Sequence, residues 1–113
     1  MANQQTLEEL YAIIKGRKET PKEGSYTNYL FDKGLDKILK KVGEEATEVV
    51  IAAKNEDPQE LVYETADVLY HLLVLLVEKG VPYEAILEEL ASREGVISKT
   101  QERKAITDRK SVV

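Results

Sequence analysis

Two acidic motifs separated by an Asp-Pro step constrain this chain more than any other feature of its sequence. The first motif is Glu44-Glu45-Ala46-Thr47-Glu48, and the second is Glu64-Thr65-Ala66-Asp67. Residues three or four positions apart share a face of an α-helix, so each motif sets two carboxylates side by side. Asp57-Pro58 lies between them, where Asp suits a helix N-cap and Pro the first helical position. The pattern predicts two antiparallel helices that bring together the carboxylates of Glu45, Glu48, Glu64 and Asp67.

Such a cluster needs a positive partner, because like charges at close range repel and raise one another's pKa values. A hard divalent cation with oxygen ligands is its natural occupant. Glu48 is followed by Val49-Val50-Ile51 and Asp67 by Val68-Leu69, and acidic residues within apolar stretches are rarely left unpaired. Two other interpretations stay open. In one, lysines of the helix that carries the first motif pair with the acids in a structural network. In the other, the acids are solvated in a helical dimer that serves as an interaction module.

Glu44 and His71 lie close to these motifs. Glu44 shares a helix face with Glu48, at the margin of the cluster. A carboxylate beside a bound metal can act as a general base on water, but a solvent-exposed residue fits the spacing equally well. His71, the only histidine, follows Asp67 by four residues, and a hydrogen-bonded packing role is favoured for it. A di-iron bundle needs a Glu-x-x-His motif on each of two helices; the absence of that motif argues against a ferritin-like oxidase.

Helical signals cover most of the remaining chain. Thr6 and Glu9 form a capping box for a helix expected to end near Lys15 or Gly16. Residues 17–25 read as a loop that Ser25-Tyr26-Thr27 continues, with a short helical turn over 29–32. Further helices are expected over 35–54, 58–79 and 82–95. No segment reads as a β-hairpin, so we expect an all-α, up-down bundle of four to five helices.

Leu72 to Val77 are apolar on every side of their expected helix. A helix that is apolar all round is buried all round, which in so small a chain predicts covering by a second subunit. We therefore expect the bundle to be completed in a homodimer.

The composition limits the class of protein and its partners. A length of 113 residues indicates one domain, assigned to residues 1–95, with a basic tail over residues 96–113. The absence of cysteine excludes disulfides and zinc-thiolate sites and fits a cytoplasmic protein. No signal stretch opens the chain, and the apolar run is too short to cross a membrane. A net charge of −5 argues against binding to duplex nucleic acid.

Basic and aromatic residues supply candidate contacts for an anionic ligand. Lysines recur at helical spacing just before the first acidic motif, at Lys33, Lys37, Lys40 and Lys41. They are expected to form one basic face beside the cluster that would clamp phosphates, although salt bridges are the simpler explanation. Tyr26 or Tyr29 is placed to stack on a base or ribose.

The motifs together resemble the phosphoribosyl-ATP pyrophosphatase family. The resemblance rests on Ser25-Tyr26-Thr27, on Lys40-Lys41-Val42-Gly43-Glu44-Glu45-Ala46-Thr47-Glu48, and on Glu64-Thr65-Ala66-Asp67-Val68-Leu69-Tyr70-His71. It runs from Thr6 to about Arg93. The carboxylate pattern alone is shared by the wider all-α, MazG-like nucleoside triphosphate pyrophosphatases, so that pattern indicates the reaction class and the flanking residues indicate the substrate.

This resemblance implies Mg²⁺-dependent hydrolysis of 1-(5-phosphoribosyl)-ATP to 1-(5-phosphoribosyl)-AMP and pyrophosphate, the second step of histidine biosynthesis. It makes Glu45, Glu48, Glu64 and Asp67 metal ligands and Glu44 the water-activating candidate. Substrate contacts are expected from Lys37, Lys40, Lys41, Ser25, Tyr26 and Thr27. The alternative is a house-cleaning nucleoside triphosphate pyrophosphatase with the same metal site. A separate phosphoribosyl-AMP cyclohydrolase would take the next step. The tail beyond Gly95 departs most from the family pattern, and whether Lys104 or Arg109 closes over substrate stays open.

Overall fold

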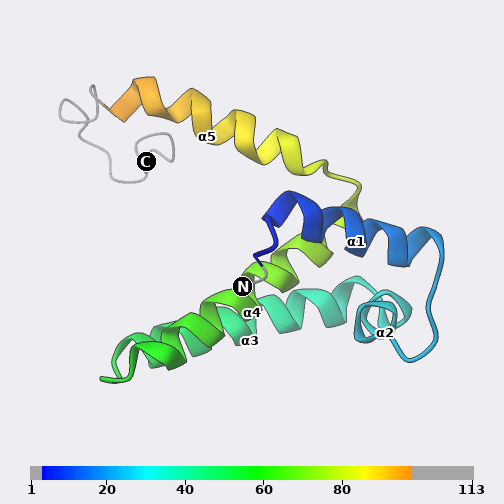
Figure 1. Cartoon of the computed structure of the whole chain (residues 1–113), viewed down its shortest axis with the longest axis horizontal. Coiled ribbons are helices and arrows are strands. Elements are labelled where there is room, and N and C mark those ends of the chain that lie inside the picture. The colour runs from blue at the N-terminus through cyan, green and yellow to red at the C-terminus, as the bar shows by residue number, and fades with distance from the viewer. Residues whose placement is uncertain (1–3, 98–113) are drawn as a thin grey trace. The chain divides into compact units, whose positions relative to one another are not determined.

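The computed structural model describes residues 4–97, and all the regular secondary structure of this part of the chain is α-helix (Figure 1). Its helices are α1 (Leu7–Glu19), α2 (Tyr26–Lys33), α3 (Leu35–Ala53), α4 (Pro58–Lys79) and α5 (Tyr83–Ile97). The expected all-α class is confirmed. The chain divides after Val81 into two compact units, so α1–α4 and α5 are described separately. The predicted basic tail, apart from its first two residues, lies outside the described residues.

The two longest helices, α3 and α4, form an antiparallel hairpin (Figure 1). Asp57 is the N-cap of α4, where its Oδ1 accepts a hydrogen bond from the Gln59 backbone N–H at 2.9 Å. Pro58 occupies the first turn, where it interrupts no helical hydrogen bond. Gly80 ends α4 in the left-handed conformation, at φ 71°. The turn signals read from the sequence are confirmed.

The capping box of α1 is also confirmed, but the predicted end of the helix is wrong. Thr6 and Glu9 exchange hydrogen bonds of 2.9 and 3.0 Å, and α1 continues past Gly16 to Glu19. One interior glycine costs only about 1 kcal/mol relative to alanine. The last turn is supported by the basic residues Arg17 and Lys18 near the helix C-terminus, and Lys18 also pairs with Glu78 of α4 at 2.8 Å.

α2 begins earlier than the sequence indicated, because loop contacts stabilise its first turn. Ser25 is its N-cap and accepts a hydrogen bond from the Asn28 N–H at 3.2 Å. The Asn28 side chain donates to the Arg17 carbonyl at 2.8 Å and accepts from the Lys22 N–H at 2.9 Å. The expectation that residues 25–27 continue a loop is therefore wrong for Tyr26 and Thr27, which are helical.

Each helix of the first unit contributes to a single core. Its most deeply buried apolar side chains are Ile14 of α1, Leu30 of α2, Ile38 of α3 and Val74 of α4. Leu73, Val74 and Val77 are buried within one chain, because α1 packs against α4, whereas Leu72 is 39% exposed. The single chain thus buries part of the apolar run, and covering of the rest by a second subunit stays a prediction. Within residues 4–97, none of the helices is long and apolar enough to pass through a membrane.

Asp57→Ala should lower the free energy of unfolding by about 1 kcal/mol, because the first turn of α4 loses its capping acceptor. Urea denaturation followed by circular dichroism measures the change. Asp57→Asn is the matched control, since it keeps a side-chain oxygen at the N-cap. Equal losses in the two variants would contradict the capping explanation.

Candidate functional site

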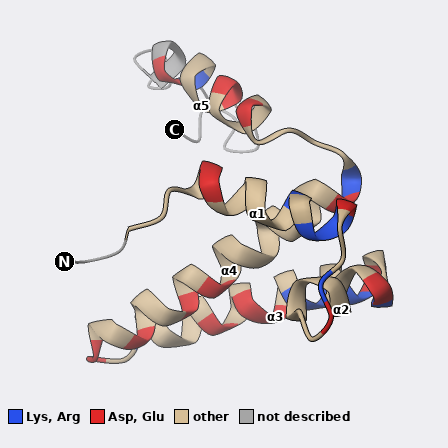
Figure 2. Ribbon diagram, turned by 45° about the vertical axis from the view of Figure 1, so that its right-hand side comes forward, with Lys and Arg blue, Asp and Glu red and all other residues tan. Residues whose placement is uncertain are grey.

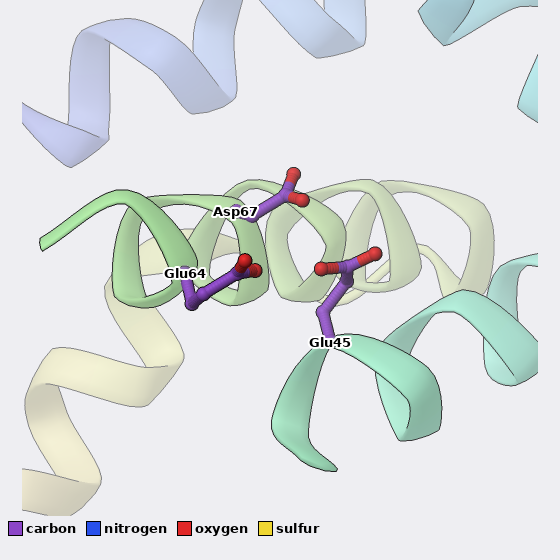
Figure 3. A group of neighbouring side chains, drawn as sticks. All are labelled: Glu45, Glu64 and Asp67. Atoms are coloured by element: carbon purple, nitrogen blue, oxygen red, sulfur yellow. The ribbon is translucent and has the colours of Figure 1, made fainter. Parts of the chain in front are cut away.

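Three carboxylates from two helices converge at the middle of the α3–α4 hairpin (Figure 3). Glu45 extends from α3, and Glu64 and Asp67 extend from α4. One carboxylate oxygen of each lies within 4.8 Å of the others. Glu45 is only 8% exposed, which separates this group from the acidic surface residues common on helical proteins. The spacing within each motif and the antiparallel hairpin together account for the convergence.

Glu48 lies beside this group but is not part of it. It is exposed, one turn after Glu45 on α3. Its negative charge is close enough to contribute to the raised pKa of Glu64. Glu48 and Glu64 also line a hollow of about 530 Å³ next to the α3–α4 turn, with Ile51 and Tyr63 among its walls. The structure therefore brings together three of the four predicted ligands and leaves Glu48 at the edge.

The electrostatics show repulsion within the cluster that Lys41 helps to outweigh only at Glu45. Burial, a hydrogen bond with Glu45 and the Glu45 charge raise the pKa of Asp67. Desolvation and the charges of Glu45 and Glu48 raise the pKa of Glu64. Burial opposes ionisation of Glu45 as well, but hydrogen bonds with Asp67 and Lys41 outweigh it and lower the pKa of Glu45. Converging hard oxygen donors that repel one another fit a divalent cation.

The four lysines fall into two pairs by their contacts. Lys41 places its ammonium 3.2 Å from Glu45 and 3.5 Å from Glu44, and Lys40 lies 3.9 Å from Glu44. Lys33 and Lys37 instead lie over the Tyr29 ring, 5.7 and 5.9 Å from its centroid. The ion pairs of Lys40 and Lys41 match the simpler explanation by salt bridges, and the clamping of phosphates by these lysines stays a prediction. Figure 2 shows the acidic residues distributed along α3 and α4.

The Ser25–Thr27 segment reaches α4 through two side-chain contacts. The Tyr26 hydroxyl lies 3.2 Å from His71 Nε2, and the hydroxyls of Thr27 and Tyr70 hydrogen-bond each other. His71 is 2% exposed and its Nδ1 lies 2.8 Å from the Asp67 carbonyl oxygen. The expected packing role of His71 is confirmed. No sequence signal pointed to Tyr26 as its partner, because the two residues come from helices far apart in the chain.

The comparison with known protein families decides the class to which this hairpin belongs. Residues 7–94 match the sequence profile described as phosphoribosyl-ATP pyrophosphohydrolase. The chain belongs to the phosphoribosyl-ATP pyrophosphohydrolase family. Membership makes it a hydrolase that acts on a phosphoric anhydride, which confirms the enzyme class expected from the motifs.

Individual relatives agree with this family assignment. The chain is 71% identical over 102 residues to a phosphoribosyl-ATP pyrophosphatase of Listeria monocytogenes serotype 4a, covering 90% of this chain and 98% of the relative. The enzyme of the same name from Lactiplantibacillus plantarum is 66% identical, with 90% and 96% covered. That from Limosilactobacillus fermentum is 64% identical over 104 residues, with 92% and 98% covered. The expected resemblance is confirmed over nearly the whole chain.

Asp67→Asn should raise the thermal midpoint of the metal-free protein by a few degrees, because it removes a carboxylate that repels Glu45 and Glu64. We expect a divalent cation that binds the cluster to raise the midpoint of the wild type, and the same change should abolish that rise. Scanning fluorimetry in EDTA and in Mg²⁺ measures both effects. Glu56→Gln, at the exposed α3–α4 turn, is the control and should leave both unchanged. A variant that keeps the full Mg²⁺ response would exclude Asp67 as a ligand.

Proposed function

We propose that this protein hydrolyses 1-(5-phosphoribosyl)-ATP to 1-(5-phosphoribosyl)-AMP and pyrophosphate in histidine biosynthesis. The observation that carries the proposal is the buried Glu45 facing Glu64 and Asp67 across the α3–α4 hairpin, in a chain matched to this family over residues 7–94. Relatives more than 60% identical carry the name of this activity. An ordinary nucleoside triphosphate pyrophosphatase is the alternative, which these matches do not favour.

The proposed cofactor is Mg²⁺, held by Glu45, Glu64 and Asp67, with Glu48 as a fourth ligand. A bound divalent ion supplies positive charge that polarises phosphoryl oxygens and offsets charge on the leaving group. The carboxylates of the chain position that charge, and their mutual repulsion is relieved when it is present. The burial of Glu45 and the raised pKa values of Glu64 and Asp67 support this role.

Glu44 is the proposed general base, which would take a proton from the attacking water. Its carboxylate lies next to the cluster without belonging to it, and is partly exposed to solvent. Lys41 contacts both Glu44 and Glu45, so this lysine fixes the distance between the proposed base and the proposed ligand. A base must reach the water that it deprotonates, and a solvated carboxylate beside the cluster meets that requirement.

Substrate phosphates are proposed to contact Lys37, Lys40 and Lys41, and Ser25, Tyr26 and Thr27 are proposed to hold the rest of the nucleotide. Ser25 and Tyr26 line a hollow of about 730 Å³ with Tyr29. The charges of Lys41, Asp67 and Glu45 act on the Tyr26 hydroxyl, whose pKa is raised mainly by burial. This residue therefore connects the hollow with the carboxylate cluster. Half of its surface stays open to a ligand.

A homodimer is proposed on the basis of the outer surface of the hairpin. Val50 of α3 is 65% exposed and Val62 of α4 is 58% exposed, and Ile51 and Tyr63 beside them are also exposed. Contiguous exposed apolar side chains mark interaction surfaces.

The proposal also includes a cytoplasmic location and a separate phosphoribosyl-AMP cyclohydrolase that consumes the product. Lys104 and Arg109, proposed to close over substrate, lie outside the described residues.

Purified protein should release pyrophosphate from phosphoribosyl-ATP in Mg²⁺, faster than from ATP or other common nucleoside triphosphates, and not in EDTA.

Glu64→Gln should lower kcat by about 100-fold or more and weaken Mg²⁺ binding in calorimetry, because a ligand is lost. Glu44→Gln should lower kcat by about 100-fold, the typical contribution of a general base, with Mg²⁺ binding intact. Glu56→Gln is the control. Preferential hydrolysis of ordinary triphosphates would support the alternative enzyme, and a fully active Glu44→Gln would exclude Glu44 as the base.

Sedimentation equilibrium should give the mass of a dimer for the wild type, and Val62→Glu should shift it to the monomer. The introduced carboxylate would be buried without a partner in an apolar interface. Glu8→Lys, which changes charge on α1, is the control and should leave the mass unchanged. A monomeric wild type would remove the proposed dimer.

A further inference from the structure

We propose that His71 is a positioning residue that holds the Ser25–Thr27 segment beside the carboxylate cluster by accepting a hydrogen bond from the Tyr26 hydroxyl. The proposal rests on the proposed function in one respect, the assignment of that segment to substrate binding. The hydrogen-bonding arrangement itself stands on the described contacts of His71 alone. The Nδ1 atom of His71 faces Asp67 and the Nε2 atom faces Tyr26, so the imidazole would act on the substrate segment through Tyr26.

The two ring nitrogens of His71 have different partners, which assigns the tautomer. Nδ1 lies 2.8 Å from the Asp67 carbonyl oxygen. A carbonyl oxygen can only accept, so Nδ1 must carry the hydrogen. The Asp67 carboxylate oxygen is farther from Nδ1, at 3.5 Å. In the neutral ring Nε2 is then an acceptor, and the Tyr26 hydroxyl at 3.2 Å donates to it.

Because His71 is buried, its Nε2 acceptor needs a hydrogen-bond donor from the protein. The side chain is 2% exposed, so water cannot replace a missing donor, and buried polar atoms in folded proteins are almost always hydrogen-bonded. Tyr26 is the donor that satisfies Nε2. The consequence for Tyr26 is that its side chain has one preferred direction, toward α4, although half of its surface is exposed.

Ring contacts support the same placement from a second direction. Tyr26 stacks on Tyr70, with ring centroids 6.2 Å apart, and meets the edge of His71 at 5.9 Å. Tyr70 and His71 themselves are 4.9 Å apart. Thr27 hydrogen-bonds Tyr70. The first turn of α2 is thus attached to consecutive residues of α4, three and four positions after Asp67.

This attachment links the proposed substrate segment to the helix that carries two of the converging carboxylates. His71 bonds to the backbone of Asp67 through Nδ1 and to Tyr26 through Nε2, so one rigid ring spans the distance between them. The Asp67 carboxylate faces Glu45 and Glu64. Loss of Nε2 should release Tyr26 while leaving the cluster intact, which gives the proposal a distinctive signature.

The first experiment is ¹⁵N NMR of the imidazole ring in the metal-free protein, at mildly alkaline pH. The chain has a single histidine, so only its two ring nitrogens have to be distinguished, by their couplings to the ring protons. We expect a protonated Nδ1, an unprotonated Nε2, and a shift of the Nε2 signal in Tyr26→Phe. A ring protonated at Nε2, or an Nε2 signal unchanged by Tyr26→Phe, would overturn the proposal. This measurement is independent of any enzymatic activity.

The second experiment compares two amides at position 71. The Asn amide overlaps Nδ1 of histidine and cannot reach Tyr26, whereas the Gln side chain carries its oxygen toward the place of Nε2. His71→Asn should raise KM for phosphoribosyl-ATP about 10-fold, the effect of one hydrogen bond, with a smaller change in kcat. His71→Gln should recover most of this loss. Calorimetric Mg²⁺ binding should be unchanged in both.

Tyr26→Phe completes the test, because it removes only the hydroxyl of an exposed side chain. It should raise KM as His71→Asn does, and the double variant should lose no more than either single variant. Additive losses, or equal KM values for His71→Asn, His71→Gln and wild type, would overturn the proposal. A wild type without activity on phosphoribosyl-ATP would instead refute the proposed function, and the NMR result would still decide the role of His71.

Discussion

The burial of Glu45 between α3 and α4 is the constraint on which the rest of this structure depends. A charged carboxylate is removed from water only where neighbours compensate for the lost hydration. Lys41 provides an ammonium 3.2 Å away, and Asp67 a hydrogen bond. These partners lie on the same helix and on the facing helix, so the register of the hairpin determines whether Glu45 is tolerated. A shift of one residue along α4 would move Asp67 to another face.

The helices around the hairpin make that register rigid. Ile38 and Val74 pack the inner faces of α3 and α4, and Leu30 and Ile14 close the core from α2 and α1. The converging carboxylates are therefore carried by helices rather than by loops, which suits a site that must hold its geometry while charge is added or removed. The segment before α2 is less regular, and Asn28 attaches it to α1 through Lys22 and Arg17. Thr27 and Tyr26 attach the first turn of α2 to α4.

Much of the site followed from local rules. Helical spacing placed the two motifs, and Asp57-Pro58 and Gly80 delimited α4 correctly. The contacts of the lysines could not be predicted from helical spacing. Lys33 and Lys37 lie over the ring of Tyr29 in α2, and the spacing along α3 does not place that ring. Glu48 was grouped with the other acids on the same spacing; the structure leaves it at the edge of the group of three, and its role as a fourth ligand stays a prediction. The early start of α2 was also not predicted, because contacts with loop residues stabilise its first turn.

The sequence by itself determined the helices and the antiparallel hairpin, because these depend on contacts between residues close in the chain. It also determined the family, because the acidic motifs and the residues that flank them can be recognised without a structure. Only the tertiary structure decided which acids meet, which lysines reach them, and that His71 pairs with Tyr26. Those outcomes depend on side chains separated by dozens of residues. Their distances follow from how the helices pack, and no local spacing encodes that packing.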